Sequence, residues 1–173
     1  MTSGAPPPPA SAEPPRGLLS SRFRIRPARL DDEPLILALV PRFVEHGAAD
    51  GHTPEEVIDG TRRVLAEALR LNPPSDAILI AEEEGDGQGF VYVVTERDFF
   101  TGEPYAHVSE IATDRSGSGA GAALMSAVEA WAAERGYRFV TLNVVEENRA
   151  AQRFYDRLGY GPGHRHLVKR LIS

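Results

Sequence analysis

The sequence predicts a single α/β domain of the α+β kind, in which a central mixed, mostly antiparallel sheet is flanked by helices. Its 173 residues are enough for one domain with a real core and too few for two ordinary ones. Short apolar and β-branched runs alternate with longer segments of helical periodicity. Two of the strand-like runs are joined by a tight-turn sequence, which is typical of an antiparallel pair.

The beginning of the chain differs in composition from the rest. Residues 1–20 contain six prolines and few large apolar side chains. Such a segment buries too little apolar surface to offset the entropy lost on ordering. We therefore expect a proline-rich, disordered or extended tail over residues 1–20 and the folded domain over residues 21–173.

The N-terminal part of this domain predicts one strand and two helices. Residues 23–27 alternate apolar and polar side chains, as a half-buried strand does. A pair of aspartates can cap the helix expected over residues 34–46. Thr53–Glu56 is a capping box with proline at the first helical position, and it predicts the start of a second helix over residues 54–71.

The middle of the chain predicts three strands. The apolar runs over residues 77–81 and 90–95 are joined by Glu84–Gly89, whose glycines and acidic residues favour a tight turn, so a β-hairpin is expected. A third strand over residues 105–113 follows a loop that contains two phenylalanines. Exposed aromatic residues in a loop are typical of a lid or an interface.

The C-terminal part predicts two further helices and two further strands. Apolar residues recur at helical spacing over residues 121–135, and Gly136 supplies the stop. A strand over residues 139–145 and a helix over residues 148–158 follow, and the chain ends in a strand over residues 164–172. The complete expected order is β-α-α-β-β-β-α-β-α-β.

The composition excludes several classes of function. The hydrophobic and charged fractions, 42% and 25%, are ordinary globular values. The net charge of −6 argues against a nucleic-acid partner, which needs clustered Lys and Arg. The absence of cysteine excludes a disulfide framework and a thiolate metal site, and it fits a reducing cytoplasm. Neither a signal peptide nor a membrane span is recognisable, so we expect a cytoplasmic protein without membrane or metal.

A glycine-rich turn stands between a predicted strand and a predicted helix, over Gly117–Ala122. Backbone N–H groups and the positive end of the helix dipole favour an anion at such a turn, usually a phosphate. A P-loop would require Lys and Ser or Thr after the glycines, which are not there. The dinucleotide-binding pattern G-x-G-x-x-A is matched, but the parallel strands that should follow it are missing.

A second block lies downstream and reads Asn148-x-x-Ala151-x-x-Phe154-Tyr155-x-x-x-Gly159-Tyr160. Together with the glycine turn it resembles the Gcn5-related N-acetyltransferases (GNAT), whose members typically read Arg/Gln-x-x-Gly-x-Gly/Ala and then Asn-x-x-Ala-x-x-Phe-Tyr-x-x-x-Gly-Phe/Tyr. The resemblance covers roughly residues 23–172 and implies the GNAT fold with acetyl-CoA as cosubstrate. The sequence departs from the pattern at the Arg or Gln position, where Ser116 stands after Arg115.

The resemblance implies three groups of cofactor-binding residues. The backbone of one strand end would pair with the pantetheine amides as an added strand does. The glycine turn would bind the pyrophosphate with its amides and two serine hydroxyls. Two asparagines and one tyrosine would lie near the pantetheine arm, and one of these, Asn148, can also cap its helix. The residues are Ile111, Ala112, Thr113, Ser116, Gly117, Ser118, Gly119, Ala120, Gly121, Ala122, Asn143, Asn148 and Tyr155.

The resemblance also implies catalytic residues. Tyr155 matches the residue that protonates the coenzyme A sulfur in many relatives, and its alternative role is that of a core tyrosine. Glu110 and His107 lie where relatives carry groups that act on the acceptor amine. Residues three apart on an ideal strand point to opposite faces, so at most one of the two is expected to reach the site unless the strand bulges.

The predicted function is acetyl transfer from acetyl-CoA to a primary amine, directly and in a ternary complex. The acceptor is a small-molecule amine or a peptide or protein amine, selected by the Phe99–Pro104 loop and the two N-terminal helices. A non-catalytic domain that binds or senses acyl-CoA is the alternative. The final strands would offer a homodimer contact.

Overall fold

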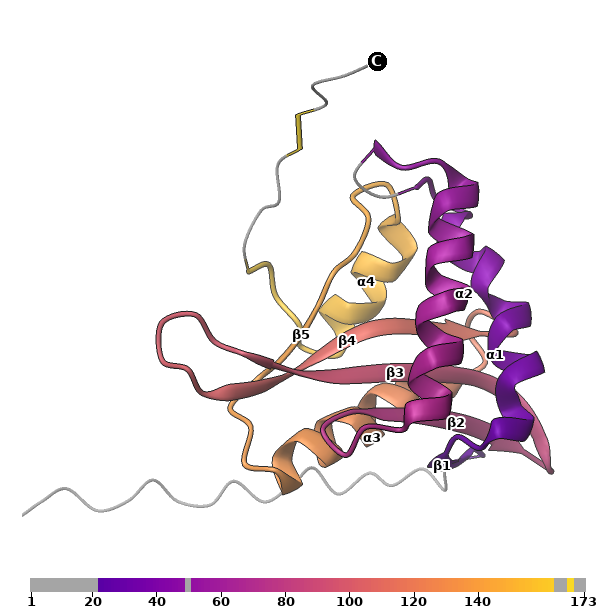
Figure 1. Ribbon diagram of the computed structural model, residues 1–173, viewed down its shortest axis with the longest axis horizontal. Helices are drawn as coiled ribbons and strands as arrows, with labels where there is room; N and C mark the ends of the chain where they lie inside the picture. The colour runs from indigo at the N-terminus through magenta and orange to yellow at the C-terminus, as the bar shows by residue number, and fades with distance from the viewer. Residues whose placement is uncertain (1–21, 49–50, 164–167, 170–173) are drawn as a thin grey trace, which may run out of the picture.

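The computed structural model describes residues 22–48, 51–163 and 168–169, and its centre is a five-stranded sheet in the order β1-β2-β3-β4-β5 (Figure 1). Each of the first four strands pairs antiparallel with the next, and β4 pairs parallel with β5. The mixed, mostly antiparallel sheet is therefore confirmed. The strands are β1 (Arg24–Pro27), β2 (Ala77–Glu83), β3 (Asp86–Arg97), β4 (Pro104–Thr113) and β5 (Val140–Leu142).

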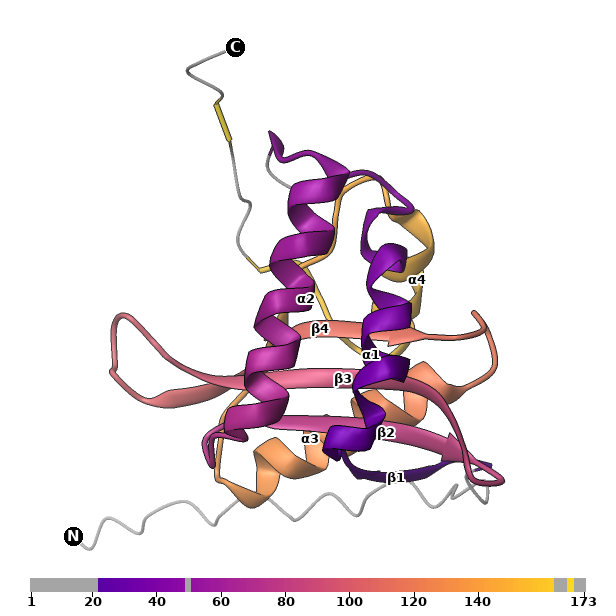
Figure 2. The same ribbon diagram turned by 45° about the vertical axis from the view of Figure 1, so that its right-hand side comes forward.

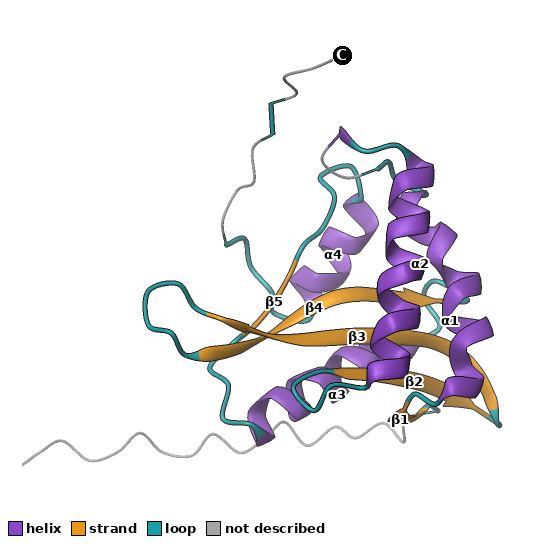
Figure 3. Ribbon diagram, viewed as in Figure 1, coloured by secondary structure: helices purple, strands orange, loops and turns teal. Residues whose placement is uncertain are grey.

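Helices cover both faces of the sheet (Figures 2 and 3). One face carries α1 and α2, which cross the strands in Figure 2, and the other carries α3 and α4. The α-helices are α1 (Glu33–Leu39), α2 (Pro54–Leu71), α3 (Ala120–Glu134) and α4 (Arg149–Arg157), and the 3-10 helices are η1 (Leu30–Asp32) and η2 (Val40–Val44). The predicted tail over residues 1–20 lies outside the described residues, as does the predicted strand over residues 164–172 apart from two positions.

Each face of the sheet has its own apolar core. Val91, Val93 and Val108 point towards α3, where Leu124 and Met125 are completely buried. The opposite core joins α1, η2 and α2 to alternate residues of the same strands. This alternation follows from the period of two along a strand. Both faces of the sheet are therefore covered by apolar side chains, and we expect a site at an edge or an end of the sheet.

Two predicted elements differ from the structure. The helix expected over residues 34–46 ends as an α-helix at Leu39 and continues as the 3-10 helix η2. Pro41 accounts for the change, because it has no N–H to donate into the α-helical ladder and its ring crowds the preceding turn. The strand expected over residues 139–145 is shorter than predicted, since β5 leaves the sheet after Leu142.

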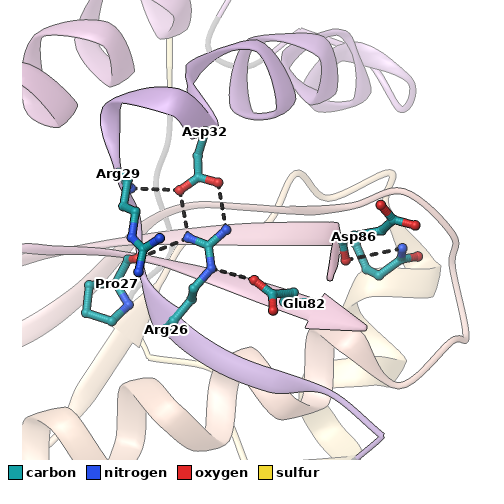
Figure 4. A network of polar contacts seen from close by, with 7 residues as sticks. Arg26, Pro27, Arg29, Asp32, Glu82 and Asp86 are labelled. Carbon is teal, nitrogen blue, oxygen red and sulfur yellow. Dashed lines mark hydrogen bonds and ion pairs between the residues drawn. The ribbon is translucent and has the colours of Figure 1, made fainter. Parts of the chain in front are cut away.

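A polar network fixes the start of the domain (Figure 4). Arg26 on β1 forms a two-pronged ion pair with Asp32, with N–O distances of 2.7 and 2.8 Å, and its Nε donates to Glu82 on β2 at 2.6 Å. The backbone N–H of Arg29 donates to the same aspartate at 2.7 Å. The guanidinium holds the pKa of the Asp32 carboxyl below its usual value. The network ties β1, β2 and η1 together.

Candidate active site

A cleft of about 650 Å³ lies between β4 and the chain that follows β5. The two strands pair only from Ala106 to Val108 on β4. From Ser109 to Thr113, within the described residues, no strand pairs with this edge of β4. Unpaired backbone donors and acceptors along a strand edge are a template for an added extended chain. The cleft therefore offers main-chain hydrogen bonding along one wall.

The glycine turn forms the end of this cleft. Gly117 and Gly119 have φ values of +76° and +96°, a left-handed conformation that favours glycine. Gly119 is also the N-cap residue of α3 and has no side chain to accept a hydrogen bond from the first turn of that helix. The N–H groups there and the positive end of the helix dipole can stabilise an anion.

The structure brings most of the sequence-predicted residues together. Thirteen of the fifteen predicted site residues line the cleft, namely Glu110, Ile111, Ala112, Thr113, Ser116, Gly117, Ser118, Gly119, Gly121, Ala122, Asn143, Asn148 and Tyr155. Ala120 and His107 do not line it. Ala120 is fully buried, and its N–H donates to the Ser118 hydroxyl at 3.3 Å.

A β-bulge places the two candidate bases on the same face of the sheet. Tyr92 pairs with Glu110 and Val93 pairs with Val108, so Ser109 is one extra residue on β4. The bulge that the sequence analysis allowed for is therefore present, and the opposite faces expected of an ideal strand do not apply here. Past the bulge, Glu110 lies on the face covered by α1 and α2, as His107 before it does.

His107 and Glu110 nevertheless have different surroundings. The His107 Nδ1 lies 2.7 Å from the hydroxyl oxygen of Thr141 on β5, where the two strands still pair. Glu110 lies beyond the paired region and lines the cleft. The structure therefore separates the two residues along β4 rather than across it.

The Glu110 carboxyl is incompletely paired. Its Oε2 is buried and makes no hydrogen bond, and it is the only buried side-chain N or O atom of this kind among the residues that the structure describes. Burial raises the pKa of Glu110 above its ordinary value, and the Ser109 side chain opposes this shift in part. A carboxyl with a raised pKa at the wall of a cleft is a candidate to accept and release a proton during a reaction.

Tyr155 lies on the opposite wall of the cleft, on α4. Its ring makes edge contacts with Phe154 and Tyr160, with centroid distances of 5.0 and 5.9 Å. Burial raises the pKa of Tyr155 to about 12. The hydroxyl therefore keeps its proton at neutral pH and is available as a donor. Both sequence-based roles for Tyr155 fit this place, because the residue packs against the core and also lines the cleft.

The two asparagines lie on the same side of the cleft as Tyr155. The Asn148 Oδ1 accepts a hydrogen bond from the backbone N–H of Ala151 at 2.9 Å, so the residue caps α4 as expected. Asn143 follows β5 directly and lines the cleft. Their contacts with a cofactor stay predictions.

One wall of the cleft was not predicted from the sequence. Arg42, Phe43, Glu45 and His46, in and just after η2, line it from the α1 side. Arg42 donates to the backbone oxygen of Thr113 across 71 positions of sequence. No local pattern predicts such a contact, and Pro41 was the only available sign that the chain turns at this point. The loop around Phe99 and Phe100, expected to select the acceptor, does not line the cleft.

Two further findings concern metals and membranes. The described residues contain no group of three or more His, Asp or Glu side chains placed to hold a metal ion. None of the helices in the described part is long and apolar enough to pass through a bilayer.

Comparison with known proteins identifies the family. The model of the Acetyltransferase (GNAT) family matches residues 44–160, more than half of the chain. The chain belongs to this family, whose members are acyl-CoA-dependent N-acetyltransferases. No curated protein sequence matches the chain significantly.

Solved structures share the fold at low sequence identity. A GCN5-related N-acetyltransferase from Ralstonia eutropha JMP134 is 21% identical, with a TM-score of 0.67 over 86% of this chain and 98% of its own. AAC(6')-Iy in complex with the bisubstrate analogue CoA-S-monomethyl-acetylneamine is 20% identical, with a TM-score of 0.67 over 87% and 99%. Glucosamine-6-phosphate N-acetyltransferase from Arabidopsis thaliana is 21% identical, with a TM-score of 0.61 over 87% and 99%. The fold is that of the GNAT acetyltransferases.

Proposed function

We propose that this protein transfers an acetyl group from acetyl-CoA to a primary amine, directly and within a ternary complex. The observation that carries the proposal is the cleft itself, which combines an open strand edge, a glycine turn at a helix N-terminus, a half-paired carboxyl and a protonated tyrosine. The family supplies the class of reaction.

The walls of the cleft fit the parts of acyl-CoA. The edge of β4 from Ser109 to Thr113 would hydrogen-bond the pantetheine amides. The turn Gly117–Ala122 would hold the pyrophosphate. Bound there, acyl-CoA supplies an acyl group activated as a thioester. A solved relative, AAC(6')-Iy, is itself a complex with a CoA-containing bisubstrate analogue, which supports this use of the fold.

We assign the proton transfers to Glu110 and Tyr155. The Glu110 carboxylate takes a proton from the acceptor ammonium, directly or through a water, and leaves a neutral amine. The amine nitrogen then forms a C–N bond with the acyl carbon as the C–S bond breaks. The Tyr155 hydroxyl gives its proton to the departing sulfur, and its phenolate regains a proton from the acylated nitrogen through a water, which leaves a neutral amide. Glu110 releases the proton it took from the ammonium to solvent. Glu110 is preferred to His107 as the base because only Glu110 lines the cleft.

The available residues support direct transfer. The sequence contains no cysteine to form an acyl-enzyme, and no motif activates a serine. The acceptor is a small-molecule amine or a peptide or protein amine. We place its subsite against Glu110 and the lining residues Phe43, Glu45 and His46, where the cleft meets the α1 side.

The test is an acceptor screen in which release of the CoA thiol is measured, with mass spectrometry of the acceptor as the second readout. The proposed function predicts thiol release that depends on the acceptor, and a gain of one acetyl group on its amine. Tight binding of CoA without turnover across a broad panel of amines would favour the non-catalytic sensor instead.

A further inference from the structure

Arg42 joins the η2 segment to the start of the glycine turn. Its Nη1 donates to the backbone oxygens of Thr113 and Asp114 at 2.8 and 2.5 Å, and its Nη2 lies 3.4 Å from the Ser116 hydroxyl oxygen. Arg42 itself lines the cleft. A guanidinium from the N-terminal part of the chain therefore lies where β4 ends and the turn to α3 begins.

Neighbouring acidic groups compensate the positive charge of this guanidinium only weakly. The acid paired with it is Glu45, with an Nε–Oε1 distance of 3.5 Å, and the two side chains are 31% and 50% exposed. An ion pair of this length and exposure is weak. The other oxygens that Arg42 contacts belong to uncharged groups. The turn thus has a cation beside it in addition to the N–H groups and the dipole of α3.

We propose that Arg42 supplies the cationic side chain that binds the pyrophosphate of acyl-CoA, in place of a side chain at position 116. The inference rests on the proposed function, because it concerns the same cofactor. Ser116 is short and neutral, and its hydroxyl lies against the Arg42 guanidinium. Arg42 also precedes the residues 44–160 that match the family model, so this contribution comes from outside the matched segment.

The chemistry of arginine suits this role. Its planar group carries five N–H donors, and because Nη1 is used by the two backbone oxygens, Nη2 on the side of Ser116 is the nitrogen that we assign to a phosphate oxygen. The backbone carbonyls of Thr113 and Asp114 orient the group without neutralising it. Loss of the charge would therefore weaken binding of ligands that contain the pyrophosphate and leave ligands without it unaffected.

The test is binding of CoA by isothermal titration to the wild type and to Arg42→Gln, in the absence of any acceptor. A charge-assisted hydrogen bond of ordinary strength predicts a dissociation constant on the order of tenfold to a hundredfold higher for the variant. The loss should be equal for 3′-dephospho-CoA, which retains the pyrophosphate. The dissociation constant of pantetheine, which lacks it, should not change.

Two further variants separate charge from structure. Arg42→Lys keeps the charge and should lose less affinity than Arg42→Gln, and Ser116→Arg in the Arg42→Gln background should restore binding of CoA. Arg62→Gln is the matched control, because it removes the same charge from an exposed position on α2 that does not line the cleft. It should bind CoA as the wild type does.

Other outcomes overturn the inference. An equal loss for pantetheine would make Arg42 a merely structural residue, and an unchanged affinity of Arg42→Gln for CoA would remove it from the cofactor site. A wild type that binds no CoA would contradict the proposed function as well. The two failures are therefore distinguishable.

Discussion

Asp32 and Glu110 are carboxyl groups with opposite surroundings. Asp32 accepts hydrogen bonds from both terminal nitrogens of Arg26 and from the backbone of Arg29, and its pKa is lowered. Glu110 has a buried oxygen without a partner, and its pKa is raised. A buried carboxyl with all its partners serves the fold. One that lacks a partner and faces a cleft is a candidate for chemistry, where the partner comes from outside.

Removal of the two carboxylates should therefore affect different properties, and the largest effect concerns activity. Glu110→Gln should lower kcat by about 10²- to 10⁴-fold, the usual contribution of a general base, and leave the fold intact. Steady-state kinetics with the acceptor found in the screen measure this change. A kcat within about twofold of the wild type would exclude Glu110 as the base.

Tyr155→Phe extends the comparison to the opposite wall of the cleft. The substitution removes the proposed proton donor and keeps the ring that packs against Phe154 and Tyr160. We expect kcat to fall by about 10²-fold, with a smaller change in KM. If kcat stays unchanged while the temperature of unfolding falls, Tyr155 is a core residue only.

Asp32→Asn should lower stability and leave the chemistry unchanged. The variant loses the two-pronged ion pair with Arg26, whose guanidinium keeps its contacts with Glu82 and with the backbone oxygen of Pro27. The expected loss is about 3 kcal/mol in the free energy of unfolding, measured by urea denaturation. The kcat of the folded variant should match that of the wild type. A large fall in kcat, measured where Asp32→Asn is fully folded, would mean that the polar network around Arg26 also positions residues of the cleft.

The pH dependence of stability should have opposite signs for the two groups. The lowered pKa of Asp32 stabilises the fold above the ordinary value of 3.8, and this stability is lost as the pH falls through the folded-state pKa. The raised pKa of Glu110 has the opposite effect. It stabilises the fold below pH 4.5, the ordinary pKa of a glutamate, and this stability is lost as the pH rises through the folded-state pKa. Urea denaturation at a series of pH values should show each contribution disappear in Asp32→Asn and Glu110→Gln respectively.

The smallest effect is expected at a region that contains neither carboxyl. Phe99 and Phe100 are 92% and 86% exposed at the tip of the β3–β4 hairpin, which extends away from the helices in Figure 1. Replacement of both by serine should change the free energy of unfolding by less than about 0.5 kcal/mol per residue and leave kcat/KM unchanged. A raised KM for the acceptor would restore this loop as a determinant of acceptor choice.

Much of the fold follows from local sequence. The capping box at Thr53, the glycine-rich turn before β3 and the apolar spacing in α3 are local signals, and the helices and strands they predict are present. The extent of α1 and β5 was less predictable. Pro41 changes the type of helix, and β5 ends where its pairing with β4 ends rather than where its apolar sequence does.

The site was predictable where a motif marked it. The glycine turn and the block around Tyr155 both contribute to the cleft. The Ser109 bulge and the Arg42 contact with Thr113 depend on pairing and packing between distant segments, which no spacing in the sequence records. The bulge also decides how Glu110 is presented, so the most informative residue of the site needed the structure for its interpretation.

The ratio of kcat/KM for the wild type to that for Glu110→Gln, measured across pH with one acceptor, tests the central claim most directly. In the proposed mechanism the wild type takes the acceptor as an ammonium and removes its proton, whereas Glu110→Gln reacts only with acceptor that is already a neutral amine. If Glu110 is the base, the ratio is therefore largest well below the pKa of the amine and falls as the pH rises towards that pKa, because neutral amine then bypasses the missing carboxylate. A ratio that stays constant across the whole pH range would contradict the assignment.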